Sequence, residues 1–173
     1  GLYGPDAAET LARAGAGNLV DLPLFAWRAV TLAGQPCSVQ RVEGIGSDGW
    51  TVLGPAPAGG ALRSALLAAG ATAIAEDAFT VARVEAGVPA TGSELNEQVS
   101  PLEAGLQRFC NDRKGCYTGQ EIVARTQYRG ILKKRMAIAH VDGAEPAPGQ
   151  SVYSPAFGDQ SAGTVANVAP APG

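Results

Sequence analysis

The stretch NDRKGCYTGQEIVAR, residues 111–125, places a thiol, a lysine and a helix-start signal close together. Thr118 and Glu121 have the spacing of a capping box, in which each side chain satisfies an unpaired backbone donor at the start of a helix. Cys116 lies two residues before that start, near Lys114. A helix N-terminus and a neighbouring cation both favour the nucleophilic thiolate of a cysteine. Because free cysteines are also often buried and inert, the local sequence leaves both roles open.

The composition is that of a folded protein with one or two modest domains. The chain has 173 residues, of which 46% are hydrophobic and 17% charged, enough apolar material for a core. No apolar run reaches the roughly 20 residues of a membrane span, and the first residues do not have the pattern of a signal peptide. Three cysteines, an odd number, do not make a disulfide framework. These features predict a cytoplasmic protein without membrane attachment.

Positive charge is concentrated in residues 108–135, which we call the basic segment. Its eight bases stand against Asp112 and Glu121, so the segment has a net charge of +6. The whole chain carries −3, which leaves −9 for the remainder. A local basic field suits an anionic partner, although pairing with the protein's own acidic residues is an alternative. The bases are Arg108, Arg113, Lys114, Arg125, Arg129, Lys133, Lys134 and Arg135.

The first half of the chain has the pattern of helices packed on an antiparallel sheet. Helices are predicted at residues 6–14 and 61–71. Trp27 and Val30 are expected in the core. This order of elements predicts an α+β fold. Strands, separated by turn signals, are predicted at residues 24–34, 37–45 and 50–54.

The second half predicts two more helices followed by short strands. The helices are expected over 78–87 and 119–129, the second ending at Gly130. Residues 133–141 alternate as a half-buried strand does, and three later turn signals indicate a small β-barrel. The predicted domains are an α+β layer over 1–80, a central segment over 81–130 and an incomplete C-terminal β-barrel over 131–173.

Several familiar site patterns are not matched. His140, the sole histidine, lies in a predicted strand without an evident catalytic partner. Cys110 and Cys116 have a C-x5-C spacing, which is not a zinc pattern, so no metal site is predicted. Gly15 and Gly17 do not complete a dinucleotide-binding fingerprint.

Glu85, in the sequence RVEAG, is a carboxylate in an apolar context near the end of a predicted helix. A buried carboxylate needs partners, and paired N–H donors of a flat heterocycle, such as a pterin or a purine, would serve. A salt bridge to Arg83 or another internal base is the simpler alternative, and both stay open here.

Two blocks of the sequence resemble a known family. KGCYTGQEIVAR, residues 114–125, is similar to the K-G-C-[FY]-x-G-Q-E signature of the YgfZ-type folate-binding proteins, relatives of the aminomethyltransferase (T-protein) of the glycine cleavage system. ARVEAGVP, residues 82–89, resembles the R-[IVL]-E-A-G-x-P segment of the same family. The matching residues are Arg83, Glu85, Ala86, Gly87, Pro89, Lys114, Gly115, Cys116, Tyr117, Gly119, Gln120, Glu121 and Arg125.

The resemblance implies a T-protein-like fold around a central folate pocket, ending in a small β-barrel. It implies tetrahydrofolate as the cofactor, with Glu85 bound to the pterin ring. It also implies that Cys116 is the reactive thiol, with Lys114 beside it as its catalytic partner. Family members act in the assembly or repair of iron–sulfur enzymes, including enzymes that thiolate tRNA, so such clients are the implied partners. The remaining folate-pocket residues would be Arg83, Tyr117, Gln120 and Arg125.

Two other functions are weighed against this one. The first is a tetrahydrofolate-dependent aminomethyltransferase or demethylase, although the sequence shows no evident general base in a catalytic constellation. The second is direct nucleic-acid binding by the basic segment, which would be strongly salt-dependent. The overall acidity and the few aromatic residues near the bases count against it. Whether the protein is an enzyme stays open at this point.

Overall fold

The computed structural model describes residues 1–111, 113–130 and 132–170. The chain forms two compact units, of which the first comprises Gly1–Ala86 and the second begins at Gly87. The division into three domains at residues 80 and 130 stays a prediction. None of the helices in the described ranges is long and apolar enough to cross a bilayer.

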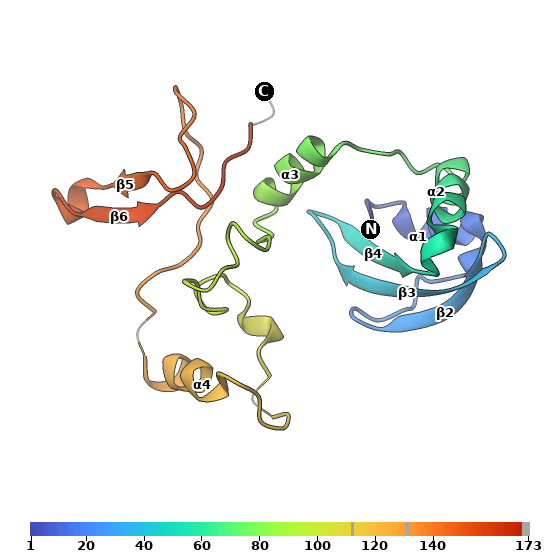
Figure 1. Ribbon diagram of the computed structural model, residues 1–173, viewed down its shortest axis with the longest axis horizontal. Coiled ribbons are helices and arrows are strands. Elements are labelled where there is room, and N and C mark those ends of the chain that lie inside the picture. The colour runs from blue at the N-terminus through green and yellow to red at the C-terminus, as the bar shows by residue number, and fades with distance from the viewer. Residues whose placement is uncertain (112, 131, 171–173) are drawn as a thin grey trace. The chain divides into compact units, whose positions relative to one another are not determined.

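The first unit is a four-stranded antiparallel sheet with α1 and α2 on one face (Figure 1). Its strand order is β1-β4-β3-β2, and the predicted strands and helices of the first half are confirmed. The strands are β1 (Leu2–Tyr3), β2 (Trp27–Leu32), β3 (Gln35–Glu43) and β4 (Asp48–Leu53). The helices are α1 (Ala7–Leu11), which continues as a wider turn over Ala12–Ala16, α2 (Gly59–Ala68) and α3 (Glu76–Glu85).

The core of the first unit lies between these two helices and one face of the sheet. Leu11 of α1 and Leu62 of α2 pack in one cluster with Val39 and Trp50. In the antiparallel register Val39 lies opposite Val52, and Trp50 lies opposite Arg41, so these residues share a face. Val30 packs against the cluster, as expected from the sequence.

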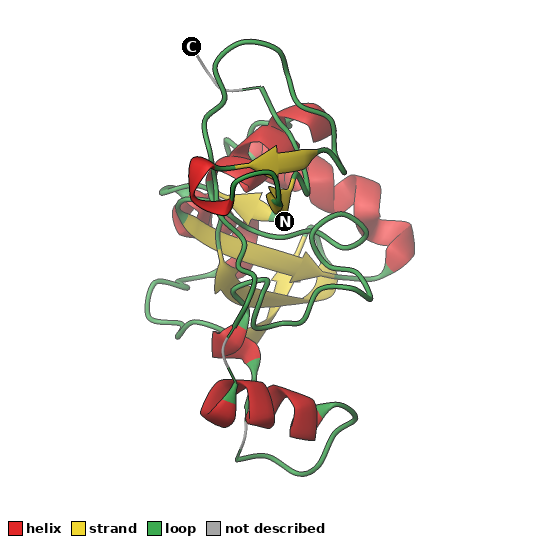
Figure 2. Cartoon of the chain, turned by 90° about the vertical axis from the view of Figure 1, so that its left-hand side faces the viewer, coloured by secondary structure: helices red, strands yellow, loops and turns green. Residues whose placement is uncertain are grey.

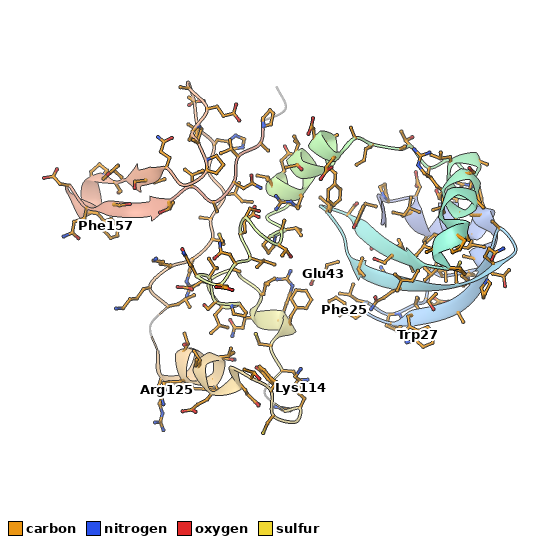
Figure 3. The ribbon with its side chains drawn as sticks, viewed as in Figure 1. Phe25, Trp27, Glu43, Lys114, Arg125 and Phe157 are labelled. Atoms are coloured by element: carbon orange, nitrogen blue, oxygen red, sulfur yellow. The ribbon has the colours of Figure 1, made fainter. Side chains whose placement is uncertain are left out.

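The expectation that Trp27 is a core residue is wrong, because its side chain is 65% exposed. Trp27 pairs with Gln40, the neighbour of Val39. Since successive side chains of a strand point to opposite faces, Trp27 lies on the face away from the helices (Figure 3). Val30 is three positions further along and therefore points inward.

The second unit contains one α-helix and one two-stranded sheet among its described residues. Helix α4 is joined on both sides by loops (Figure 2), and its span confirms the predicted helix. Strands β5 and β6 pair antiparallel. The elements are a 3-10 turn (Gln107–Phe109), α4 (Gln120–Arg129), β5 (Ser151–Tyr153), a second 3-10 turn (Pro155–Phe157) and β6 (Ser161–Thr164).

The predicted strand over 133–141 is wrong for this structure. Its Met136 N–H donates to the carbonyl of Glu103 at 3.0 Å, but no strand of the described residues pairs with it. Ile138 and Val141 are 58% and 59% exposed, so these two apolar side chains are not buried as those of a half-buried strand would be. Alternation favours a strand only where a neighbouring strand can take up its backbone donors and acceptors.

The predicted barrel is represented by the pair β5–β6, and the described part of residues 131–173 contains no closed barrel. Residues 131 and 171–173 of that prediction lie outside the described residues. Two strands cannot close on themselves, so the barrel stays a prediction.

Candidate functional site

Glu85 is the last residue of α3, a helix whose first turn carries Glu76 and Asp77. Acidic residues at that end favour the helix through its dipole, and Gly87 follows the helix at a φ of 65°, a backbone conformation that suits glycine. The carboxylate of Glu85 is exposed, and it makes no hydrogen bond or ion pair with another described residue. The simpler alternative of a salt bridge to Arg83 is therefore not formed, and the carboxylate is available to a ligand.

Arg83 lies two residues earlier in α3 and differs from Glu85 in exposure. It is 7% exposed, and it is engaged in an interaction of its own. A ligand would reach it less readily than Glu85. Its proposed place among the folate-binding residues stays a prediction.

The motif around Cys116 forms a compact turn before α4. The Nζ atom of Lys114 lies 4.8 Å from the centroid of the Tyr117 ring, which is a cation–π contact. The Tyr117 backbone N–H donates to Oε1 of Gln120 at 3.3 Å. Cys116 stands between these residues as an exposed free thiol, so the reading of Cys116 as a buried filler is wrong.

The start of α4 differs from the predicted capping box. The N-cap is Gly119, in the left-handed conformation with a φ of 86°, and no side chain caps the helix. Glu121 does not reach back to Thr118 but pairs with Arg125 at 2.9 Å. Because both partners are largely exposed, this pair contributes little to stability. Gly119, and not Thr118, is the N-cap residue of α4. Thr118 and Glu121 therefore do not form the predicted capping box.

The structure therefore gathers part of the predicted site. Cys116, Lys114, Tyr117 and Gln120 lie together in one turn, and Arg125 projects from α4, paired with Glu121 (Figure 3). Arg83 and Glu85 belong to the first unit.

A polar turn before the motif was missed by the sequence analysis. The Glu103 Oε2 atom accepts the backbone N–H and the hydroxyl of Ser100, both at 2.9 Å, and Ser100 Oγ accepts the Glu103 N–H at 3.3 Å. This is the hydrogen-bond pattern of a capping box, formed here in a turn and not at the start of a helix, and the Ser-x-x-Glu spacing of residues 100–103 was the signal for it. The turn borders a cavity of about 360 Å³, whose lining includes Leu102, Gln107, Thr126, Leu132 and Met136.

The hydrogen bond from the Ser100 backbone, assisted by the Ser100 hydroxyl and the charge of Lys134, holds the pKa of Glu103 below its usual value of 4.5. A carboxyl whose pKa is lower in the folded state stabilises that state above the unfolded pKa. The contribution disappears as the pH falls through the folded pKa. We expect the turn over residues 100–106 to open more readily below about pH 4.5.

Hydrogen exchange of the Leu106 N–H, which is bonded to the carbonyl of Pro101 at 2.8 Å, measures this opening. The Glu103→Gln variant should lose most of the acid dependence. Glu97→Gln, at an exposed carboxylate, is the control and should keep it. Equal acid dependence in Glu103→Gln and in the unchanged chain would contradict the prediction.

All three cysteines are free thiols: Cys37 is buried, Cys110 is half-buried and Cys116 is exposed. Cys110 Sγ lies 3.8 Å from the Leu106 carbonyl. In the described ranges, no group of three or more histidine, cysteine or acidic side chains is placed to hold a metal ion. A reactive role therefore rests on Cys116 and not on a cysteine pair.

The sequence of the chain matches a known protein family over more than half of its length. A family model described as the GCVT N-terminal domain matches residues 1–114. The chain belongs to this family of aminomethyltransferase-like folate-binding proteins. The match covers the whole first unit of this GCVT-family chain and ends at Lys114, the first residue of the KGCYTGQE motif.

Several curated proteins are similar to this GCVT-family chain. The aminomethyltransferase of Thermosynechococcus vestitus is 31% identical over 166 residues, covering 95% of the chain and 45% of that protein. The aminomethyltransferase of Moorella thermoacetica is 32% identical, covering 85% of the chain and 41% of that protein. A putative chloroplastic transferase of Arabidopsis thaliana is 29% identical, covering 87% and 35%. The chain thus spans less than half the length of these relatives.

Proposed function

We propose that the protein is a cytoplasmic tetrahydrofolate-binding accessory protein for the assembly or repair of iron–sulfur enzymes, and that it supports tRNA modification indirectly. The observation that carries this proposal is Cys116, an exposed free thiol within the KGCYTGQE motif. The motif resembles the YgfZ-type signature, and its Tyr117 contacts both Lys114 and Gln120.

The residues present fit a folate. Tetrahydrofolate would supply a reduced pterin that carries one-carbon units. The pterin presents adjacent N–H donors, and the exposed carboxylate of Glu85 offers two acceptor oxygens without a competing partner in the described residues. Family membership supports the same ligand.

The motif residues have separate roles in this proposal. Cys116 presents its thiol to solvent, where a client protein can reach it. Lys114 lies against the Tyr117 ring, which limits the positions of its ammonium group. Gln120 holds the backbone of Tyr117 and thereby shapes the turn.

A tetrahydrofolate-dependent aminomethyltransferase is the second candidate. It is favoured by the names of the relatives, since the T. vestitus and M. thermoacetica proteins are both aminomethyltransferases. This function requires turnover of a methylated or aminomethylated substrate with folate present. Measured turnover that survives Cys116→Ser would favour the transferase over the accessory protein.

The first test is a titration with tetrahydrofolate, followed by tryptophan fluorescence. We expect Glu85→Gln to weaken binding by about tenfold or more, because hydrogen bonds to a charged acceptor are each worth about 1.5–3 kcal/mol. Glu76→Gln, an exposed carboxylate at the other end of α3, should bind as the unchanged chain does. Equal affinities of the two variants would remove Glu85 from the folate site.

The second test replaces Cys116 with serine in cells that depend on the protein. We expect the activity of the iron–sulfur client enzymes to fall to the level of a deletion, because serine lacks a thiol of comparable nucleophilicity. Cys110→Ser is the matched control and should keep client activity. Full client activity with Cys116→Ser would remove the thiol from the mechanism.

A further inference from the structure

Helix α3 carries Glu85 as its last residue, but it lies outside the core of the first unit. The core cluster of that unit, whose residues are all described, draws its side chains from α1, α2, the sheet and the connecting segments, and none from α3. The connection from α2 to α3 is exposed over residues 72–75 and contains neither helix nor strand (Figure 1). A helix of ten residues is only marginally stable by itself in water, so α3 needs a contact that holds it in place.

Phe79 and Tyr3 form such a contact between α3 and the sheet. Their ring centroids lie 5.8 Å apart, and the ring planes are tilted by 42°. This separation lies within the range that aromatic pairs prefer. Both rings are partly covered, since Phe79 is half-buried and Tyr3 is 37% exposed.

The backbone of Tyr3 is held by the sheet. Tyr3 lies opposite Gly49 in the antiparallel pairing of β1 with β4. In the adjacent pair, Leu2 lies opposite Trp50, which is buried in the core. The Tyr3 ring therefore projects from a strand that is fixed to the core, and Phe79 connects α3 to that strand.

We propose that Tyr3 and Phe79 are positioning residues for the Glu85 carboxylate. Phe79 precedes Glu85 by six residues on α3, which corresponds to about 9 Å along the helix axis and about 120° around it. Phe79 therefore lies against the sheet while Glu85 stays exposed. The inference rests on the proposed function, in which Glu85 binds the pterin of tetrahydrofolate, and adds which residues hold that carboxylate in place.

The expected size of the effect follows from the ring contact. An aromatic pair of this kind shifts a conformational equilibrium by about two- to tenfold. Without the pair, α3 spends less time in the arrangement that the structure shows, and the apparent affinity falls in proportion to the population of the competent state. Arg83, on the same helix, has an interaction of its own, so loss of the ring pair should weaken binding and not abolish it.

Hydrogen exchange of α3 tests the contact without any ligand. We expect the Ala86 N–H, which is bonded to the Ala82 carbonyl at 3.0 Å, to exchange about two- to tenfold faster in Tyr3→Ala and in Phe79→Ala. Alanine favours a helix more than phenylalanine does, so faster exchange in Phe79→Ala cannot come from local helix propensity. Tyr3→Phe keeps the ring and should restore slow exchange. Phe157→Ala, at a ring 57% exposed in the second unit, is the control and should exchange as the unchanged chain does.

Tetrahydrofolate titration of the same variants tests the positioning role. Tyr3→Ala and Phe79→Ala should each weaken binding by about two- to tenfold. The double variant should lose no more than either single variant, because both remove the same contact. In a Glu85→Ala background, Phe79→Ala should have no further effect, because a positioning residue acts through the group that it positions. A purely structural role would produce the same loss in both backgrounds.

The outcomes separate this inference from the proposed function. Unchanged exchange in Tyr3→Ala and Phe79→Ala would overturn the inference whether or not folate binds. Full affinity of Phe79→Ala for tetrahydrofolate, or an equal loss in the Glu85→Ala background, would overturn the positioning role and leave the proposed function standing. No binding by the unchanged chain would overturn the proposed function and the positioning role together.

Discussion

Replacing Trp50 with alanine is expected to lower the free energy of unfolding by about 3–5 kcal/mol, the usual cost of removing a large buried aromatic side chain. Trp50 is 1% exposed and packs in the cluster between the sheet and the helices of the first unit. The substitution would leave a cavity that the surrounding β-strands cannot close without breaking their register. Urea denaturation followed by circular dichroism measures the change.

Two controls make this prediction specific. Trp27→Ala removes the same side chain from a position that is 65% exposed, so it should cost less than about 1 kcal/mol. Trp50→Phe should cost less than Trp50→Ala, because the phenyl ring leaves a smaller cavity. Both variants remove the buried Trp50 Nε1 donor, which has no hydrogen-bond partner among the described residues. Similar losses for Trp27→Ala and Trp50→Ala would contradict the assignment of the core face.

Replacing Gly44 with alanine is expected to destabilise the first unit by about 1–3 kcal/mol through overpacking. Gly44 begins the connection from β3 to β4, where Glu43 pairs with Asp48. An added Cβ would overlap the carbonyl oxygen of Ser47 and lie 2.7 Å from the carbonyl carbon of Asp48. Both are backbone atoms, so the connection must shift and disturb the pairing of the two strands.

Gly60→Ala is the matched control for Gly44→Ala. Gly60 lies in α2, and an added Cβ would meet no atom within 4 Å. Alanine is favoured over glycine in a helix by about 0.5–1 kcal/mol, so this variant should be neutral or slightly more stable. Thermal unfolding of the two variants gives the comparison. A stable Gly44→Ala chain would show that the β3–β4 connection is more open than the structure has it.

The proposed function involves both units, whereas the stability predictions concern only the first. The first unit carries Glu85 at the end of α3, and the second carries the motif with Cys116. Loss of folate binding in Glu85→Gln and loss of client activity in Cys116→Ser are independent outcomes. A chain that does not bind tetrahydrofolate but loses client activity in Cys116→Ser would be a thiol protein of the GCVT family without a folate-dependent role.

Periodicity in the sequence was sufficient to predict α1, α2 and the strands β2, β3 and β4 of the first unit, but not the short strand β1. Residues 6–14 and 61–71 have helical patterns, and the three segments between them are bounded by turn residues, so local preference and packing agree. Helices α3 and α4 were predicted from their sequence patterns and from the glycines, Gly87 and Gly130, at which those patterns end. The motif residues were also visible in the sequence, because Lys114, Cys116 and Gln120 are neighbours along the chain.

Other features were decided only by the tertiary structure, because they depend on which atoms meet across the fold. Trp27 has the hydrophobicity of a core residue, but the β2–β3 register turns it to the outer face. Residues 133–141 alternate as a strand does, but a strand needs a neighbour to accept and donate its backbone hydrogen bonds. The capping box predicted at Thr118 and Glu121 does not form. Ser100 and Glu103, which have the same spacing, form that hydrogen-bond pattern in a turn. Hydrophobicity and spacing propose contacts, whereas register and backbone conformation select the ones that form.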